Sequence, residues 1–190
     1  METAKGTKIT MKAKVSSLSP NPAPNKLNIN ITATGKANRG ISAGNVTTEG
    51  GTLTITNNSD GVEGSSDKYT AKGIKADGSI ALKAGDITIT MTGTGGKGIK
   101  SAGTYTQGQT DGTGPTLVIS TTGSSLGSSG NMGGGGLGPG GGMQESSGSS
   151  AKAIKAVGTA TLLGGETTIT TQTDGAEGLE SKTAIYIEGG

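Results

Sequence analysis

Hydrophobic and polar residues alternate in short segments along most of the chain. The clearest stretch runs from Lys72 to Thr90, where a Gly-Ile step is followed by a polar turn and two alternating segments. Alternation with a period of two is typical of a β-strand that buries one face. The residues of this unit predicted to point inward are Ile74, Ile80, Leu82, Ile87 and Ile89.

The same unit recurs along the chain. The Gly-Ile step or its equivalent occurs at Gly40-Ile41, Gly73-Ile74, Gly98-Ile99, Ala153-Ile154 and Gly178-Leu179. Ile74 and Ile99 are 25 residues apart (99 − 74), as are Ile154 and Leu179 (179 − 154). A fixed period of this size indicates a repeat architecture. We therefore predict an all-β fold, a right-handed parallel β-helix (solenoid) of about 25-residue coils, with the handedness usual for parallel crossovers.

One domain is predicted over residues 1–190, because stacked coils make one body. It is divided into an N-terminal lead-in with a cap strand (1–35), coils (36–122), a flexible Gly-rich insertion (123–150) and further coils (151–190). The insertion is expected to be disordered, or to fold over one face through Met132, Leu137 and Met143. The last coil is predicted to be open or truncated, and an open strand edge favours self-association.

The repeat also predicts corners and one unusual core position. Gly51, Gly85 and Gly165 separate alternating segments and are expected to have positive φ. Tyr105 occupies the place that Ile80 has in its own coil, so its side chain should be buried. Extra residues through Tyr69 should form a surface loop.

Composition and charge narrow the functional classes. The chain has 38 Gly and no Phe, Trp, Cys or His. Thiol catalysis, disulfides, thiolate metal sites and imidazole-based triads are therefore excluded. A formal net charge of +2 gives no basic stripe for nucleic acid. The sequence contains no apolar run of about 20 residues, so no transmembrane segment is predicted.

Lysines recur at two fixed places beside the Gly-Ile step. Lys75, Lys100 and Lys155 follow it, and Lys72 and Lys97 precede it, with Lys152 equivalent. We expect both sets to form outward columns with neighbouring strands about 4.8 Å apart. Two interpretations stay open: a solvated basic face, or a track for an acidic polysaccharide to which Tyr69 could also contribute.

Carboxylates gather in two similar corner segments and behind one Gly-Ile step. These residues are Asp60, Glu63, Asp77, Asp174, Glu177 and Glu180. Calcium takes six to eight oxygen ligands, which polar corners can supply. The segments are either calcium sites or ordinary structural turns.

Thr-x-Thr pairs form a third recurring pattern. They are Thr54/Thr56, Thr88/Thr90 and Thr168/Thr170, interrupted by Val118/Ser120. Threonine is common on exposed strand faces. A flat threonine array is also similar to the ice-binding face of some antifreeze proteins.

The motifs AKGIKADGSIALKAGDITIT, GGKGIKSAG and GAEGLESKTAIYIEGG, with the Gly-rich insertion, resemble the exported bacterial carbohydrate-binding β-helix family. Its members are pectate-lyase-like, occur in Bacteroidetes and Clostridia, and include some labelled adhesins. The resemblance covers roughly residues 36–190. It implies non-catalytic binding of plant or acidic polysaccharide (pectin-type or cellulose), bound Ca²⁺, and display at the cell surface, often as a lipoprotein.

The sequence therefore predicts a non-catalytic extracellular carbohydrate-binding protein whose partner is a polysaccharide or cell-surface glycan. The alternatives are a structural cell-surface adhesin, a calcium-dependent polysaccharide lyase and an ice-binding protein. A lyase would need a lysine of lowered pKa as its general base.

Overall fold

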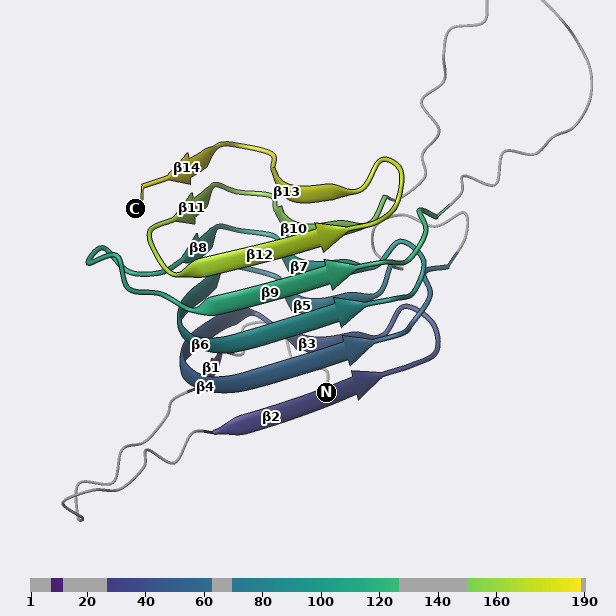
Figure 1. Ribbon diagram of the computed structural model, residues 1–190, viewed down its shortest axis with the longest axis horizontal. Coiled ribbons are helices and arrows are strands. Elements are labelled where there is room, and N and C mark those ends of the chain that lie inside the picture. The colour runs from purple at the N-terminus through teal and green to yellow at the C-terminus, as the bar shows by residue number, and fades with distance from the viewer. Residues whose placement is uncertain (1–7, 12–26, 63–69, 127–149, 189–190) are drawn as a thin grey trace, which may run out of the picture.

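The computed structural model of the chain describes residues 8–11, 27–62, 70–126 and 150–188 (Figure 1). Within these ranges the secondary structure consists of β-strands and turns, so the predicted all-β class is confirmed. No helix in the described ranges is long and apolar enough to cross a membrane. The strands belong to two sheets, in which every pairing is parallel.

Sheet A is the smaller sheet and carries the Gly-Ile steps. Its order is β13-β10-β7-β5-β3. Its five strands are β3 (Arg39–Ala43), β5 (Lys72–Ala76), β7 (Lys97–Ser101), β10 (Lys152–Ala156) and β13 (Glu177–Ser181). The 25-residue period brings Ile74 into register with Ile99, and Ile154 with Leu179.

Sheet B has two arms and, within the described ranges, nine strands. The first arm contains β1, the first halves of β4 and β6, and then β8, β11 and β14; the second contains β2, the second halves of β4 and β6, β9 and β12. The strand bounds are β1 (Lys8–Met11), β2 (Asn28–Ala33), β4 (Asn45–Asn57), β6 (Ile80–Met91), β8 (Tyr105–Gln107), β9 (Thr116–Thr121), β11 (Ala160–Leu162), β12 (Glu166–Thr171) and β14 (Ile185–Ile187).

Glycines mark the bend between the two arms, as predicted. Gly51 has φ 82°, Gly85 has φ 111° and Gly165 has φ 89°. These values lie in the left-handed region, which a side chain with a Cβ rarely adopts. Because of this bend, a single continuous strand such as β6 belongs to both arms.

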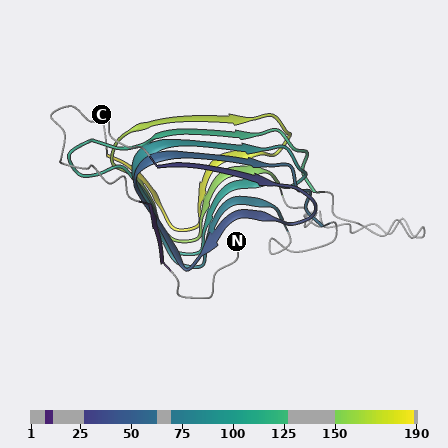
Figure 2. The same ribbon diagram turned by 90° about the horizontal axis from the view of Figure 1, so that it is seen from below.

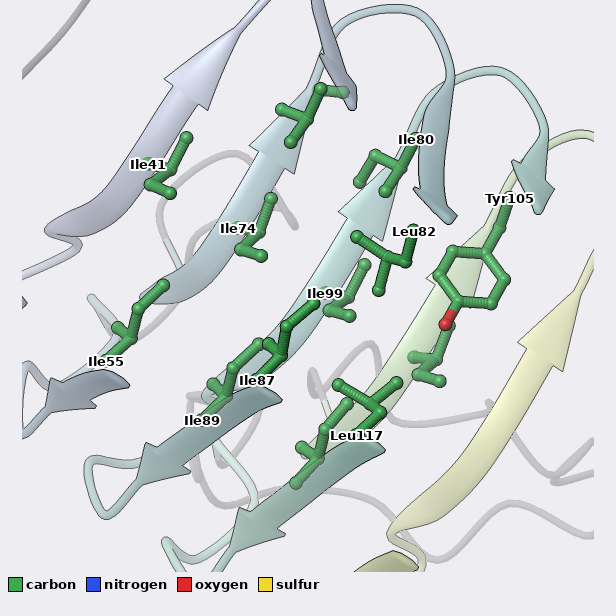
Figure 3. Close-up of a cluster of buried hydrophobic side chains, with 14 of the residues drawn as sticks. Ile41, Ile55, Ile74, Ile80, Leu82, Ile87, Ile89, Ile99, Tyr105 and Leu117 are labelled. Atoms are coloured by element: carbon green, nitrogen blue, oxygen red, sulfur yellow. The ribbon is translucent and has the colours of Figure 1, made fainter. Parts of the chain in front are cut away.

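The core lies between the sheets and consists of aligned aliphatic side chains (Figure 3). Ile74 and Ile99 come from sheet A, whereas Ile89 comes from the second arm of sheet B, and all three are fully buried. Burying each such side chain stabilises the fold by about 1.5–3 kcal/mol.

Tyr105 is fully buried in the core, as predicted. Burial raises the pKa of its phenol. Its hydroxyl group donates a hydrogen bond of 3.1 Å to Gln107 Oε1.

The predicted right-handed β-helix is wrong. In the described residues the strands form two separate parallel sheets, of nine and five strands, that are not closed or curled into a solenoid. Seen along the stack in Figure 2, the chain passes back and forth between these sheets, and the arrangement is sandwich-like. The period and the alternation fix which strands pair within each sheet, but they do not fix whether the sheets close around an axis.

Exposure rises toward the last strands of the described chain. Ile169 and Leu179 are half-buried, while Ile185, Tyr186 and Ile187 of β14 are exposed. Self-association through this edge stays a prediction. The surface loop through Tyr69 and most of the Gly-rich insertion lie outside the described residues.

Candidate functional site

Three lysines of sheet A form one column across adjacent strands, here called the outer lysine column. Lys75 of β5 is in register with Lys100 of β7, which is in register with Lys155 of β10. All three are half-buried. Because neighbouring strands lie about 4.8 Å apart, the column presents one cation per strand at that interval.

Carboxylates lie close to both ends of the outer lysine column. Lys75 Nζ is 2.6 Å from Asp77 Oδ1, two residues along the chain. Lys155 Nζ is 3.5 Å from Glu180 Oε2, where β13 carries an acid in the position that β10 gives to lysine. These ion pairs reduce the net positive charge of the face but leave it with more cations than anions among its named residues.

Glu180 lies beside two lysines, and both affect its ionisation. Partial burial opposes its ionisation, but a hydrogen bond from Lys152 and the positive charge of Lys155 outweigh that effect and lower the pKa of Glu180. The distance from Lys152 Nζ to Glu180 Oε2 is 3.0 Å. Glu180 is therefore a structural partner of two lysines and is ionised at neutral pH.

The second predicted column, here called the inner lysine column, is not on the solvent side. Lys72 and Lys97 are 1% and 0% exposed, and Lys152 is 8% exposed. Successive residues of a strand face opposite sides, so residues three apart cannot both point outward. The prediction that Lys72 and Lys97 point outward into solvent is therefore wrong.

Thr70 links the two most deeply buried lysines. Lys72 Nζ donates to Thr70 O at 2.7 Å and to Thr70 Oγ1 at 3.0 Å, and Lys97 Nζ is 3.4 Å from the same hydroxyl. Lys152 instead pairs with Glu177 and Glu180. Buried ammonium groups need such partners because their desolvation costs several kcal/mol per ion.

The predicted calcium ligands separate into two corners of the fold. Asp77 lies between sheet A and the first arm, whereas Asp60 and Asp174 follow the second arm. Asp60 and Asp174 are three strands apart in the stack, or about 14 Å. Glu63 and Tyr69 lie outside the described residues.

Four of the predicted calcium ligands already have partners within the chain. Asp60 Oδ1 accepts hydrogen bonds from Thr94, and Asp77, Glu177 and Glu180 are paired with lysines. No group of three or more acidic side chains that could hold a metal occurs in the described ranges. The geometry supports structural roles for these carboxylates.

A cavity of about 570 Å³ at the bend of sheet B was not predicted from the sequence. Its lining includes Gln107, Asp111 and Thr167. Gln107 Oε1 accepts a 2.8 Å hydrogen bond from Thr167, and hydrogen bonds from Thr113 lower the pKa of Asp111. The Asp111 carboxylate in the lining of this cavity would repel an acidic ligand. No motif or run of charged residues in the sequence predicts the cavity.

Comparison of the chain with protein-family models, with curated proteins and with solved structures gives no match.

Proposed function

We propose that this protein is a non-catalytic polysaccharide-binding protein of the cell surface that holds an acidic glycan along the outer lysine column. The observation that carries the proposal is the register of Lys75, Lys100 and Lys155 on three adjacent strands. A linear chain of acidic sugars has carboxylates at regular intervals, so a glycan lying across the strands can meet one ammonium group per strand.

The ion pairs already present predict modest, salt-sensitive binding. A carboxylate of the glycan would compete with Asp77 for Lys75 and with Glu180 for Lys155. Contacts between partly exposed charges contribute about 0.2–1 kcal/mol each and are weakened by salt. Affinity must therefore arise from several contacts along one polymer rather than from one strong site.

The proposal includes no reaction. A lysine acting as a general base must lose its proton near neutral pH, which requires desolvation without a stabilising anion. Lys75 and Lys155 each have a carboxylate beside the ammonium group, so neither has the anion-free surroundings that such a base requires.

The test compares two triple variants with the same change in net charge. Lys75→Gln/Lys100→Gln/Lys155→Gln removes the outer lysine column, and Lys36→Gln/Lys83→Gln/Lys182→Gln removes three exposed lysines elsewhere. Binding to polygalacturonate is measured by isothermal titration calorimetry. We expect the first variant to lose about tenfold in affinity, since three contacts of roughly 0.5 kcal/mol each are removed, and the second to stay close to the parent protein.

Equal losses in the two triple variants would show general charge attraction and overturn the site. Binding to cellulose but not to polygalacturonate would overturn the acidic ligand. An absence of binding to every acidic and neutral polysaccharide would overturn the function and favour a structural adhesin.

A further inference from the structure

The second arm of sheet B has an outward surface built from two rows of small branched or polar side chains, here called the threonine face. Figure 1 shows its five strand segments side by side, from β2 to β12. One row contains Asn30, Thr54, Thr88, Val118 and Thr168, and the other contains Thr32, Thr56, Thr90, Ser120 and Thr170.

The threonine face differs in charge from the rest of the surface. The chain carries 16 Lys and Arg residues, yet none lies in the five strand segments 28–33, 52–57, 86–91, 116–121 and 166–171. Their acidic residues, Asp86 and Glu166, lie at the first position of a segment, outside the two rows. Because the two rows contain no charged residue, a charged ligand would find no complementary charge there. The face therefore suits a neutral ligand.

The hydroxyl groups of the two rows are available to water. Thr88, Thr168 and Thr170 are exposed, and no side-chain hydrogen bond engages these three hydroxyl groups in the part of the chain that the structure describes. By contrast, Thr92, just outside the rows, donates a 2.8 Å hydrogen bond to Asn58 Oδ1.

The array is held rigidly. β-Branched side chains have few allowed χ1 rotamers, and the inward neighbours of the rows, such as Leu53, Ile55 and Ile89, are at most 1% exposed. In Figure 2 the strands of this arm form a stack of nearly straight lines on one side of the molecule. The hydroxyl and methyl groups therefore repeat on a nearly flat lattice.

That lattice is close to the spacing of water in ice. Hydrogen-bonded oxygens lie about 2.75 Å apart, so a tetrahedral network places second neighbours at about 4.5 Å and repeats its layers at about 7.3 Å. Adjacent strands are about 4.8 Å apart, and alternate residues along a strand are about 6.6 Å apart. Across five strands the mismatch accumulates to only about 1 Å.

We propose that the threonine face binds ice. The methyl groups of threonine hold neighbouring water in an ordered shell, while the hydroxyl groups hydrogen-bond to that shell at nearly the lattice interval. Val118 interrupts the hydroxyl groups but has the branched shape of threonine, so the surface stays continuous. A neutral polysaccharide is less favoured because sugar rings bind flat aromatic platforms, and the rows contain none.

The experiment measures thermal hysteresis and the shape of ice crystals grown in a solution of the protein. Thr88→Lys/Thr90→Lys places two long cations in the centre of the threonine face. Thr106→Lys is the control, because Thr106 is on the outward side of the first arm, between Ala81 and Thr161. Circular dichroism establishes that all variants keep their strands.

We expect faceted crystals and measurable hysteresis for the parent protein, and a loss of about tenfold or more for the double variant because the lysines prevent close approach. Thr106→Lys and the Lys75→Gln/Lys100→Gln/Lys155→Gln variant should match the parent, which separates this inference from glycan binding.

The proposal would be overturned if the parent protein did not shape ice crystals, or if the double variant kept the same hysteresis as the parent. Retention on crystalline cellulose without ice shaping would also overturn it and assign the face to a neutral polysaccharide.

Discussion

The two lysine columns of sheet A have the same residue type and the same period but opposite environments. In β7, Lys97 is fully buried, whereas Lys100 is half-buried on the outer side. The inner lysine column makes bonds to Thr70 and to two glutamates, and the outer lysine column contacts carboxylates near solvent. The difference shows that the side of the strand decides whether a lysine is buried among fixed partners or lies near solvent.

The largest expected effect comes from shortening a lysine of the inner column. Lys97→Ala removes a buried four-carbon stem, and deletions of comparable size in cores cost about 2–5 kcal/mol. Lys100→Ala should cost less than about 1 kcal/mol, since its side chain is partly exposed and its charge contacts are screened. Urea unfolding followed by circular dichroism compares the two variants.

A third variant separates the stem of Lys97 from its charge. Lys97→Met keeps an apolar stem of the same length, with a sulfur in place of one methylene, and removes the ammonium group; replacing a buried charge by an apolar side chain is often neutral. We expect its free energy of unfolding to stay within about 1 kcal/mol of the parent protein. A loss in Lys97→Met as large as that in Lys97→Ala would contradict the assignment of stability to the stem.

The glycine between the two columns gives the next largest effect. A Cβ at Gly98 would lie 2.6 Å from Ala153 O and 2.6 Å from Ile119 Cγ2, so neither strand could keep its place. Such overpacking costs about 1–3 kcal/mol. Gly98→Ala should therefore lower the urea midpoint clearly.

Gly178 supplies the matched control for Gly98, because it occupies the equivalent position in β13. A Cβ there would meet Ile169 Cγ2 at 3.6 Å, which is an ordinary contact. Replacing glycine by alanine restricts the unfolded chain and stabilises by about 0.4–1 kcal/mol where the backbone permits it. A shift of the same sign and size in both alanine variants would show that close packing at Gly98 does not determine the cost of the substitution.

Much of the strand pattern could be predicted from the sequence. Alternation at Ile87 and Ile89, and the 25-residue spacing of Ile74 and Ile99, predicted strands and neighbours that the structure confirms. These are local properties of a chain with one buried face. Whether two parallel sheets close on themselves depends on the angles at the corners, which the alternation does not encode.

The candidate site was predicted less well, and the burial of Lys97 shows why. Charge alone suggested an outward side chain, but the separation of three residues from Lys100 already placed the two on opposite faces. The cavity beside Gln107 had no such signal, because it joins a loop after β8 to residues of β11 and β12. Its lining residues come together only through strand register.

The smallest expected effect concerns Glu180, which contacts both columns through Lys152 and Lys155. Its pKa is lowered in the folded protein, so its contribution to stability is complete above the unfolded carboxyl pKa of about 4.3. That contribution is lost as the pH falls through the folded pKa. Glu180→Gln should therefore cost less than about 1 kcal/mol at pH 7, and the difference from the parent should become smaller when the pH is lowered to 3.

Glu166→Gln, an exposed position on β12, is the control for Glu180→Gln. Urea unfolding of both variants at the two pH values gives the comparison. Glu166→Gln should leave the free energy of unfolding nearly unchanged at either pH, since surface substitutions away from such contacts usually change it by less than about 0.5 kcal/mol. A deficit of Glu180→Gln that persists undiminished at pH 3 would mean that the side chain acts through packing, and that the link between the two columns is not electrostatic.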